Sequence, residues 1–189
     1  DTTREIDLVP SEPRLFSGAI LRIDPATGEA VPDNPLFSSS DANERRIIGY
    51  GLRNPFRFTI KPGTSEVWIG DVGWNNWEEI NRIPDLSTAR NFGWPCFEGA
   101  TGNTVLGYTG LNICPTYAQT APPFFTYNHS ASVVEGDGCT TGSSSVAGMA
   151  FYQGGSNYPA QYKDALFFSD YSRKCMWVMF PGTDGNPDP

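Results

Sequence analysis

The sequence predicts an all-β protein made of short strands joined by turns. The chain has 189 residues, which is long enough for one sizeable core. Its 20 glycines and 16 prolines interrupt the chain every few residues and disfavour long helices. Between these breakers, apolar residues alternate or cluster in short runs, as they do in strands. A segment pattern that occurs twice is the third observation, because repeated strand units are typical of modular β folds.

The first strands are expected after a polar segment at 1–16, which holds two prolines and is interpreted as an incoming loop or linker. A strand at 19–23 precedes the turn Asp24-Pro25-Ala26-Thr27-Gly28. In that turn proline presets φ and glycine accepts a left-handed conformation. A second strand is expected over "RIIGYGL", residues 46–52.

The middle of the chain predicts a hairpin and then a long loop. "FRFTI" (56–60), a Pro-Gly turn and "EVWIGDVG" (66–73) form strand, turn and strand. "WEEINRI" (77–83) alternates weakly and predicts a further short strand. Residues 84–145 are interpreted mostly as a loop insertion, with a strand edge at "PPFFTYNH" (122–129).

Three strands are expected near the end of the chain, at "SVAGMAFY" (145–152), "ALFFSDYS" (165–172) and "CMWVMF" (175–180). Helix is nearly absent. Single helical turns are allowed at 76–82 and 156–164.

The repeat consists of "EVWIGDVG" (66–73) and "ALFFSDYS" (165–172). Each copy has an apolar triplet, a small residue, Asp, one further residue and a small residue. Repeated units of about 40–50 residues with four short strands are the signature of β-propeller blades. We therefore predict about three four-stranded antiparallel blades within 17–189. Propellers typically have roughly 4–8 blades, so the remainder of a propeller or another copy of the chain is an expected partner.

Charge and hydropathy argue against two kinds of partner. The net charge is −8 at pH 7 and there is no Lys/Arg block, so neither nucleic acid nor an anionic membrane is expected to bind. No apolar run approaches the roughly 20 residues that span a bilayer. The sequence shows no signal peptide, so secretion would require the chain to be a mature or trimmed product.

The four cysteines, Cys96, Cys114, Cys139 and Cys175, include no C-x-x-C pair, so zinc is not expected. Their even number suggests two disulfides in a secreted or periplasmic protein. Four cysteines allow three pairings. Of these we favour Cys96–Cys114, which brackets one loop, and Cys139–Cys175, which ties a loop to a later strand.

The segment Arg53-Asn54-Pro55 interrupts an otherwise apolar stretch. At an inner strand end, an arginine can point into the central channel and bind an anion bidentately. Asn54 can both donate and accept hydrogen bonds. The other interpretation is an arginine that caps loop carbonyls or pairs with an acid.

A second candidate site follows in "GDVGWNNWEEIN". Gly73, between Asp71 and Trp74, suggests a tight turn whose carbonyls face a hard cation. Calcium accepts backbone oxygens as well as carboxylates, and Glu78 and Glu79 supply acid nearby. The other interpretation is that Asp71 caps the turn and the glutamates are solvated.

His129 is the one histidine of the chain and a weak candidate for a general base. A lone loop histidine is more often a bystander. Asn128 begins the glycosylation sequon Asn128-His129-Ser130, which matters only if the source is eukaryotic and secretory. No Ser-His-Asp set and no nucleotide-binding motif is found.

Taken together, residues 17–181 resemble the glucose/sorbosone dehydrogenase family. These proteins are soluble quinoproteins on a six-bladed β-propeller, related to the hedgehog-interacting-protein-like group. The resemblance rests on "GAILRIDPATGEAVPDNPLF", "IIGYGLRNPFRFTIKPGTSEVWIGDVGWNNWEEINRI", "NFGWPCFEG" and "SSVAGMAFYQGG…ALFFSDYSRKCMWVM". The G-x-R-N-P and G-D-V-G-x-N-x-W-E-E-I-N segments are specific in combination.

The resemblance implies pyrroloquinoline quinone (PQQ) and a calcium ion in the channel, and oxidation of sugars of the aldose-to-lactone type. The family's cofactor contacts map to Arg53 and Asn54, and its calcium-binding carbonyls map to Gly73 and Trp74. PQQ carries three carboxylates, which suit a guanidinium and a divalent cation.

The chain departs from the family at two places. The family's catalytic histidine lies upstream of the segment that matches residue 17, and His129 lies in the wrong segment to replace it. A lysine that contacts the cofactor aligns with Ser172, with Arg173 or Lys174 as stand-ins. The chain is thus expected to carry part of the cofactor site of an exported quinoprotein and to be inactive alone. The alternative is a non-catalytic extracellular propeller that binds a protein or a glycan.

Overall fold

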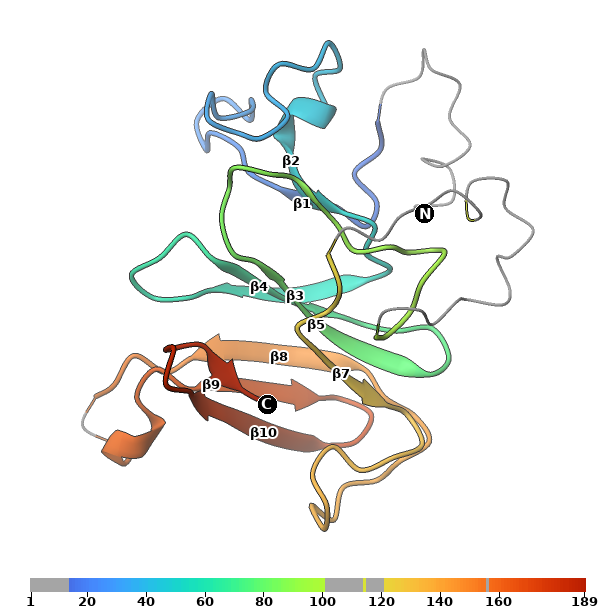
Figure 1. The fold of residues 1–189 in the computed structure, drawn as a ribbon, viewed down its shortest axis with the longest axis vertical. Helices are drawn as coiled ribbons and strands as arrows, with labels where there is room; N and C mark the ends of the chain where they lie inside the picture. The colour runs from blue at the N-terminus through green and yellow to red at the C-terminus, as the bar shows by residue number, and fades with distance from the viewer. Residues whose placement is uncertain (1–13, 101–113, 115–120, 156) are drawn as a thin grey trace.

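The fold is a computed structural model that describes residues 14–100, 114, 121–155 and 157–189. The segment expected at 1–16 lies almost wholly outside the described residues. Figure 1 shows three small sheets, and the chain returns once, with β6, from the second sheet to the first. The helical elements of the described residues are single 3₁₀ turns, η1 (Glu44–Arg46) and η3 (Ala160–Tyr162). None of the described helices has the length and apolar character needed to cross a membrane.

Sheet one has the order β1-β2-β6 and contains β1 (Ile20–Leu21), β2 (Ile47–Tyr50) and β6 (Arg90–Asn91). β1 pairs antiparallel with β2, whereas β6 pairs parallel with β2. The first strand is shorter than the predicted 19–23, because the pairing shifts register between its two residues and Arg22 bonds to the side chain of Asp33.

Sheet two has the order β3-β4-β5-β7 and is antiparallel throughout. Its strands are β3 (Pro55–Ile60), β4 (Val67–Asp71), β5 (Trp77–Ile83) and β7 (Phe125–Asn128). The weakly alternating segment 77–83 is a full strand, and the helical turn allowed at 76–82 does not form. β7 lies within the strand edge predicted at 122–129 of the long loop, and it completes the sheet by pairing with β5.

Sheet three has the order β11-β10-β9-β8. Its strands are β8 (Val146–Phe151), β9 (Leu166–Asp170), β10 (Cys175–Pro181) and β11 (Pro187–Asp188). The three predicted C-terminal strands are therefore present, and β11 adds an edge strand that the sequence does not predict. The two copies of the repeat form β4 and β9, each paired with the strands before and after it.

The strands β4 and β5 of sheet two are buried on both faces, because their alternate residues pack into two different cores. Trp68 and Ile80 enter the core shared with sheet three, whereas Val67, Ile69 and Ile83 enter the core shared with sheet one. Burying one large apolar side chain stabilises the fold by about 1.5–3 kcal/mol. This period-two division explains why β4 is buried along its whole length.

The strands β3 and β8 contact each other across the two sheets and run in the same direction (Figure 1). Their first residues are paired with the last residues of the next strands, Pro55 with Asp71 and Val146 with Asp170. The β4–β5 and β9–β10 turns therefore lie at the same end of the sheets. We call this end, where β3 and β8 begin, the loop end.

Candidate functional site

The Arg53-Asn54 pair lies at the loop end, and buried Asp71 fixes its backbone. One carboxylate oxygen of Asp71 accepts the N–H of Arg53 at 2.9 Å, and the other accepts that of Asn54 at 2.6 Å. The Asn54 carbonyl accepts the N–H of Val72 at 3.0 Å. The Asn54 side chain is exposed and makes no hydrogen bond to the described residues. Its amide is thus held outward on a fixed backbone.

The Arg53 guanidinium uses only part of its donor capacity. Its Nη1 donates to the carbonyls of Val72, at 3.0 Å, and Gly73, at 2.8 Å. The guanidinium lies 5.7 Å from the ring centroid of Trp94, which packs edge-on against Trp74. Nε and Nη2 have no hydrogen-bond partner among the described residues. Half of the guanidinium fork is therefore available to an anion.

The turn after β4 wraps around a carboxylate rather than leaving an open ring of carbonyls. The N–H groups of Trp74, Asn75 and Asn76 all point to Oε1 of Glu98. Gly73 is required here because a Cβ would collide with the carbonyl of Trp77. Since the Gly73 carbonyl accepts from Arg53, the two features expected to bind the cofactor contact each other in this structure.

Asp71 and Glu79, proposed from the sequence as weaker calcium ligands, have other partners in the structure. They lie opposite each other on β4 and β5 and are both buried. Glu79 accepts hydrogen bonds from Gly99 N–H and from Asn81 Nδ2. Burial raises the pKa of both carboxyls. The charge of Glu78 raises the pKa of Asp71 further, and the charge of Asp71 raises that of Glu79. Among the described residues, no group of three or more His, Cys, Asp or Glu side chains is arranged to hold a metal ion.

His129 lies against a buried acid and not in an open cleft. Its Nε2 is 2.8 Å from Oε1 of Glu78, a residue with no exposed surface. The other carboxylate oxygen of Glu78 accepts the N–H of Val146, at the start of β8. This arrangement favours a structural part for His129, which links the end of β7 to sheets two and three.

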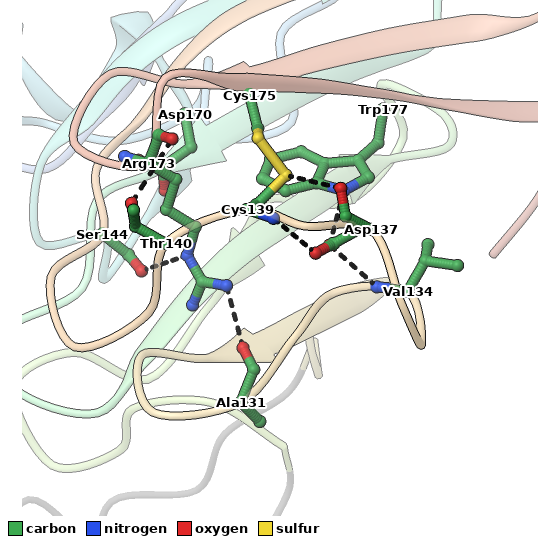
Figure 2. The surroundings of a disulfide bond; sticks show 10 residues. All are labelled: Ala131, Val134, Asp137, Cys139, Thr140, Ser144, Asp170, Arg173, Cys175 and Trp177. Atoms are coloured by element: carbon green, nitrogen blue, oxygen red, sulfur yellow. Dashed lines mark hydrogen bonds between the residues drawn. A yellow bond between two sulfur atoms is a disulfide. The ribbon is translucent and has the colours of Figure 1, made fainter.

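The guanidinium of Arg173, the stand-in cofactor contact predicted from the resemblance, is hydrogen-bonded within the protein through Nε, Nη1 and Nη2. The side chain is 2% exposed. Figure 2 shows it among the loop residues, where Nε donates to Ser144 Oγ and Nη1 to the Ala131 carbonyl. Nη2 donates to the carbonyls of Asn128 and His129, and the guanidinium stacks over Tyr127. The alignment placed Arg173 in the correct turn but could not show which way its side chain faces.

Two disulfides are formed, in the pairing favoured from the sequence. Cys96 is bonded to Cys114, and Cys139 is bonded to Cys175. The sequon residue Asn128 ends β7, and its Oδ1 accepts from both the N–H and the hydroxyl of Ser130. Glycosylation at this residue stays a prediction.

Glu98 and Trp94 are site residues that the sequence analysis did not single out. Both lie in "NFGWPCFEG", a segment that contributes to the resemblance but to which no site residue was assigned. Their contacts with the β4–β5 turn and with Arg53 arise only when the long loop folds back. A lone glutamate in a glycine-rich loop gives no sequence signal for this arrangement.

Comparison with protein families gives a match to "Glucose / Sorbosone dehydrogenase" over residues 9–179. Two curated relatives are similar. "Aldose sugar dehydrogenase YliI" of Escherichia coli (strain K12) is 31% identical over 156 residues, which cover 80% of this chain and 36% of that protein. "HIPL2 protein" of Arabidopsis thaliana is 28% identical over 186 residues, which cover 89% of this chain and 25% of that protein. The chain thus spans about a third or less of these relatives.

Solved structures give the same fold. A PQQ-bound aldose sugar dehydrogenase from Streptomyces coelicolor matches with a TM-score of 0.57 and 19% identity, over 90% of this chain and 36% of that one. A glucose dehydrogenase matches with a TM-score of 0.58 and 25% identity, over 88% of this chain and 42% of that one. The all-β architecture with antiparallel four-stranded sheets is therefore that of a partial β-propeller. With its family match extending over most of its length, the chain belongs to the glucose/sorbosone dehydrogenase family.

Proposed function

We propose that the protein containing this chain is an exported sugar dehydrogenase that uses PQQ and calcium. In this proposal the chain supplies part of the cofactor site. The observation that carries it is the Arg53-Asn54 pair, whose backbone is fixed by buried Asp71 while donors of both side chains have no partner among the described residues. A half-used guanidinium beside an outward amide suits a ligand that carries carboxylates and carbonyls.

The residues present fit PQQ in kind. Arg53 would bind a carboxylate through Nε and Nη2, and Asn54 would donate to or accept from a neighbouring oxygen. PQQ, when bound, supplies the oxidant that takes up a hydride from C1 of the sugar. Arg53 and Asn54 would orient it, and Trp94 limits how far the guanidinium can turn. We place the base that accepts the hydroxyl proton outside this chain, because the resemblance maps the family's catalytic histidine upstream of the segment that matches residue 17.

Calcium fits the carbonyls of Gly73 and Trp74 on one condition. The Gly73 carbonyl accepts from Arg53 in this structure, and a cation at that oxygen would be repelled by the guanidinium. If Arg53 turns to a cofactor carboxylate, the Gly73 carbonyl becomes available to a hard cation. Binding of the anion at Arg53 and of the cation at Gly73 is therefore expected to be mutually reinforcing.

Export and assembly complete the proposal. Two disulfides in one chain favour an oxidising compartment, either extracellular or periplasmic. Sheet three and the connection between β8 and β9 expose large apolar side chains, with Met176 at 65%, Phe180 at 40% and Tyr158 at 56% exposure. Because the chain spans about a third of its relatives, we propose that the rest of the propeller covers this face.

The test is a PQQ titration of the full-length protein that contains this chain. The wild type should show a spectral change that depends on calcium, and Arg53→Ala should weaken PQQ binding about 10- to 100-fold, as expected for hydrogen bonds to charged groups. Arg57→Ala is the matched control, because Arg57 is an exposed arginine on β3, the strand that follows Arg53. The proposal is contradicted if the folded wild type shows no calcium-dependent spectral change and reduces no dye with aldoses.

A second candidate function is a non-catalytic extracellular propeller that binds a protein or a glycan. The observation that favours it is Ser172, which stands where the resemblance places a cofactor-contacting lysine, while Arg173 is buried. In this case Arg53→Ala and the wild type would behave alike in the PQQ titration.

A further inference from the structure

The loop end is built twice on one plan. In sheet two, Asp71 accepts the N–H of Asn54, and the Asn54 carbonyl accepts the N–H of the residue after the aspartate. In sheet three, Asp170 accepts the N–H of Ser145 at 2.8 Å, and the Ser145 carbonyl accepts the N–H of Tyr171 at 2.9 Å. Ser145 is therefore the structural equivalent of Asn54, one sheet further along.

The two equivalent positions carry different chemistry. Sheet two presents the Arg53 guanidinium and the Asn54 amide. Sheet three presents hydroxyls, because Ser145 Oγ lies 3.0 Å from Ser172 Oγ and the neighbouring Arg173 is turned into the protein. We call Ser145 and Ser172 the hydroxyl pair.

The hydrogen bonds fix which way the hydroxyl pair is polarised. Ser145 Oγ donates its only hydrogen to the Ser144 carbonyl at 2.6 Å. Ser172 must therefore be the donor in its bond to Ser145. Both protons are then committed, and Ser172 Oγ is left with lone pairs. At this point the loop end accepts hydrogen bonds, whereas Arg53 donates them.

A cavity of about 530 Å³ adjoins Ser172 at the β9–β10 turn. Its lining includes Tyr171, which is 80% exposed, and Lys174. The volume lies within the range of small-molecule sites, and the open lining places an aromatic ring beside several polar groups. A ring offers a surface to the C–H face of a sugar, while the serine accepts from one of its hydroxyls.

We infer that the hydroxyl pair accepts a hydrogen bond from a hydroxyl of a neutral sugar, and that the cavity beside it seats that sugar rather than a cofactor carboxylate. This inference rests on the proposed sugar-oxidising function and assigns its two ligands to different parts of the loop end. Arg53 and Asn54 take the anionic group, and Ser172 and Tyr171 take the polyol. A carboxylate at Ser172 would meet oxygen lone pairs without a proton between them.

The experiment compares Ser172→Ala with Ser172→Thr in the full-length protein loaded with PQQ and calcium. The alanine variant should raise KM for glucose about 3- to 10-fold, the effect of one neutral hydrogen bond, with kcat and the Kd for PQQ within about twofold of wild type. Threonine keeps the hydroxyl and should restore KM. Ser143→Ala, an exposed serine of the same loop, is the matched control and should change nothing.

Two results would overturn the inference while leaving the proposed function intact. One is an unchanged KM in Ser172→Ala, and the other is a loss of PQQ affinity like that of Arg53→Ala. If the wild type binds no PQQ, the proposed function fails, and saturation-transfer NMR with glucose decides the inference separately. Transfer to glucose that is lost in Ser172→Ala supports the sugar site, and no transfer in the wild type overturns it.

Discussion

Each of the five buried carboxylates among the described residues accepts at least one backbone N–H. The five are Asp71, Glu78, Glu79, Glu98 and Asp170. A buried carboxylate is costly unless donors surround it, and backbone amides are donors that cannot move away. These acids therefore act by fixing the path of the chain, and the ligand-facing positions fall to the residues whose backbones they hold.

Asp137 shows how a single carboxylate links pH to stability. Its pKa is held below the ordinary value by the N–H of Cys139 first, and also by the N–H of Val134 and the indole of Trp177. A depressed pKa means that the stabilisation is present above the unfolded value near 3.8 and is lost as pH falls through the folded value.

We expect Asp137→Asn to lower the urea midpoint at pH 7 and to leave it nearly unchanged at pH 2. The comparison is chemical unfolding followed by tryptophan fluorescence at both pH values. Asp188→Asn, at an exposed aspartate of β11, is the control. An equal loss at both pH values would mean that ionisation of Asp137 has no part in the effect.

The site residues divide into those that local sequence can identify and those that it cannot. Arg53 and Asn54 were identifiable because a cation and a proline interrupt an apolar strand. The burial of Arg173 was not, since its partners Ala131 and Ser144 lie tens of positions away along the chain. Partners at such separations become neighbours only through the register of β8 with β9.

Among elements, the β9–β10 turn and the 131–142 loop hold each other in place. The Cys139–Cys175 disulfide joins the loop to the first residue of β10, and Trp177 Nε1 donates to Asp137 two residues further along the strand (Figure 2). Arg173 adds hydrogen bonds from the same turn. The loop is therefore anchored to sheet three although it contains no strand of its own.

Replacing both Cys139 and Cys175 by serine should lower the free energy of unfolding by about 4 kcal/mol. The estimate follows from the entropy gained by the unfolded chain when a loop with a sequence separation of 36 is released. In urea unfolding without reducing agent, the double variant should unfold at a lower urea concentration than the wild type, with Cys96–Cys114 intact in both. A double variant as stable as the oxidised wild type would contradict this.

Whether a strand could be predicted from the sequence depended on its length and on the strand with which it pairs. The strands of the hairpin β3–β4 and of β8, β9 and β10 show apolar runs between breakers, so their patterns predict them. β6 and β11 are two residues long and exist because a neighbouring strand offers its edge. No local pattern distinguishes such segments from loop.

At the scale of the whole molecule, Glu78 joins two sheets. It lies on β5 of sheet two, and its carboxylate accepts the N–H of Val146 on β8 of sheet three. The same carboxylate meets His129 and the N–H of Gly73. One buried side chain thus couples the sheets at the loop end, in addition to the apolar core that lies between them.

Glu78→Gln should lower the free energy of unfolding by about 3 kcal/mol. A glutamine of the same shape places an NH₂ where a donor already points, either toward Val146 or toward Gly73, and leaves buried donors unpaired. Calorimetry of this variant should also show a broader transition, because sheets two and three become less tightly coupled. Glu135→Gln, at an exposed glutamate, is the control. If the Glu78→Gln variant unfolds with the same Tm and the same transition width as the wild type, the coupling is contradicted.

The paired clamps of Asp71 on Asn54 and Asp170 on Ser145 act only on main-chain atoms. The identity of the side chain just before each inner strand is therefore not constrained by the clamp that positions it. Point substitutions at these positions can change what a sheet offers to a ligand without a cost in folding. Divergence of ligand preference within such an architecture then needs neither insertions nor a new scaffold, and placing an asparagine at position 145 is a direct engineering route.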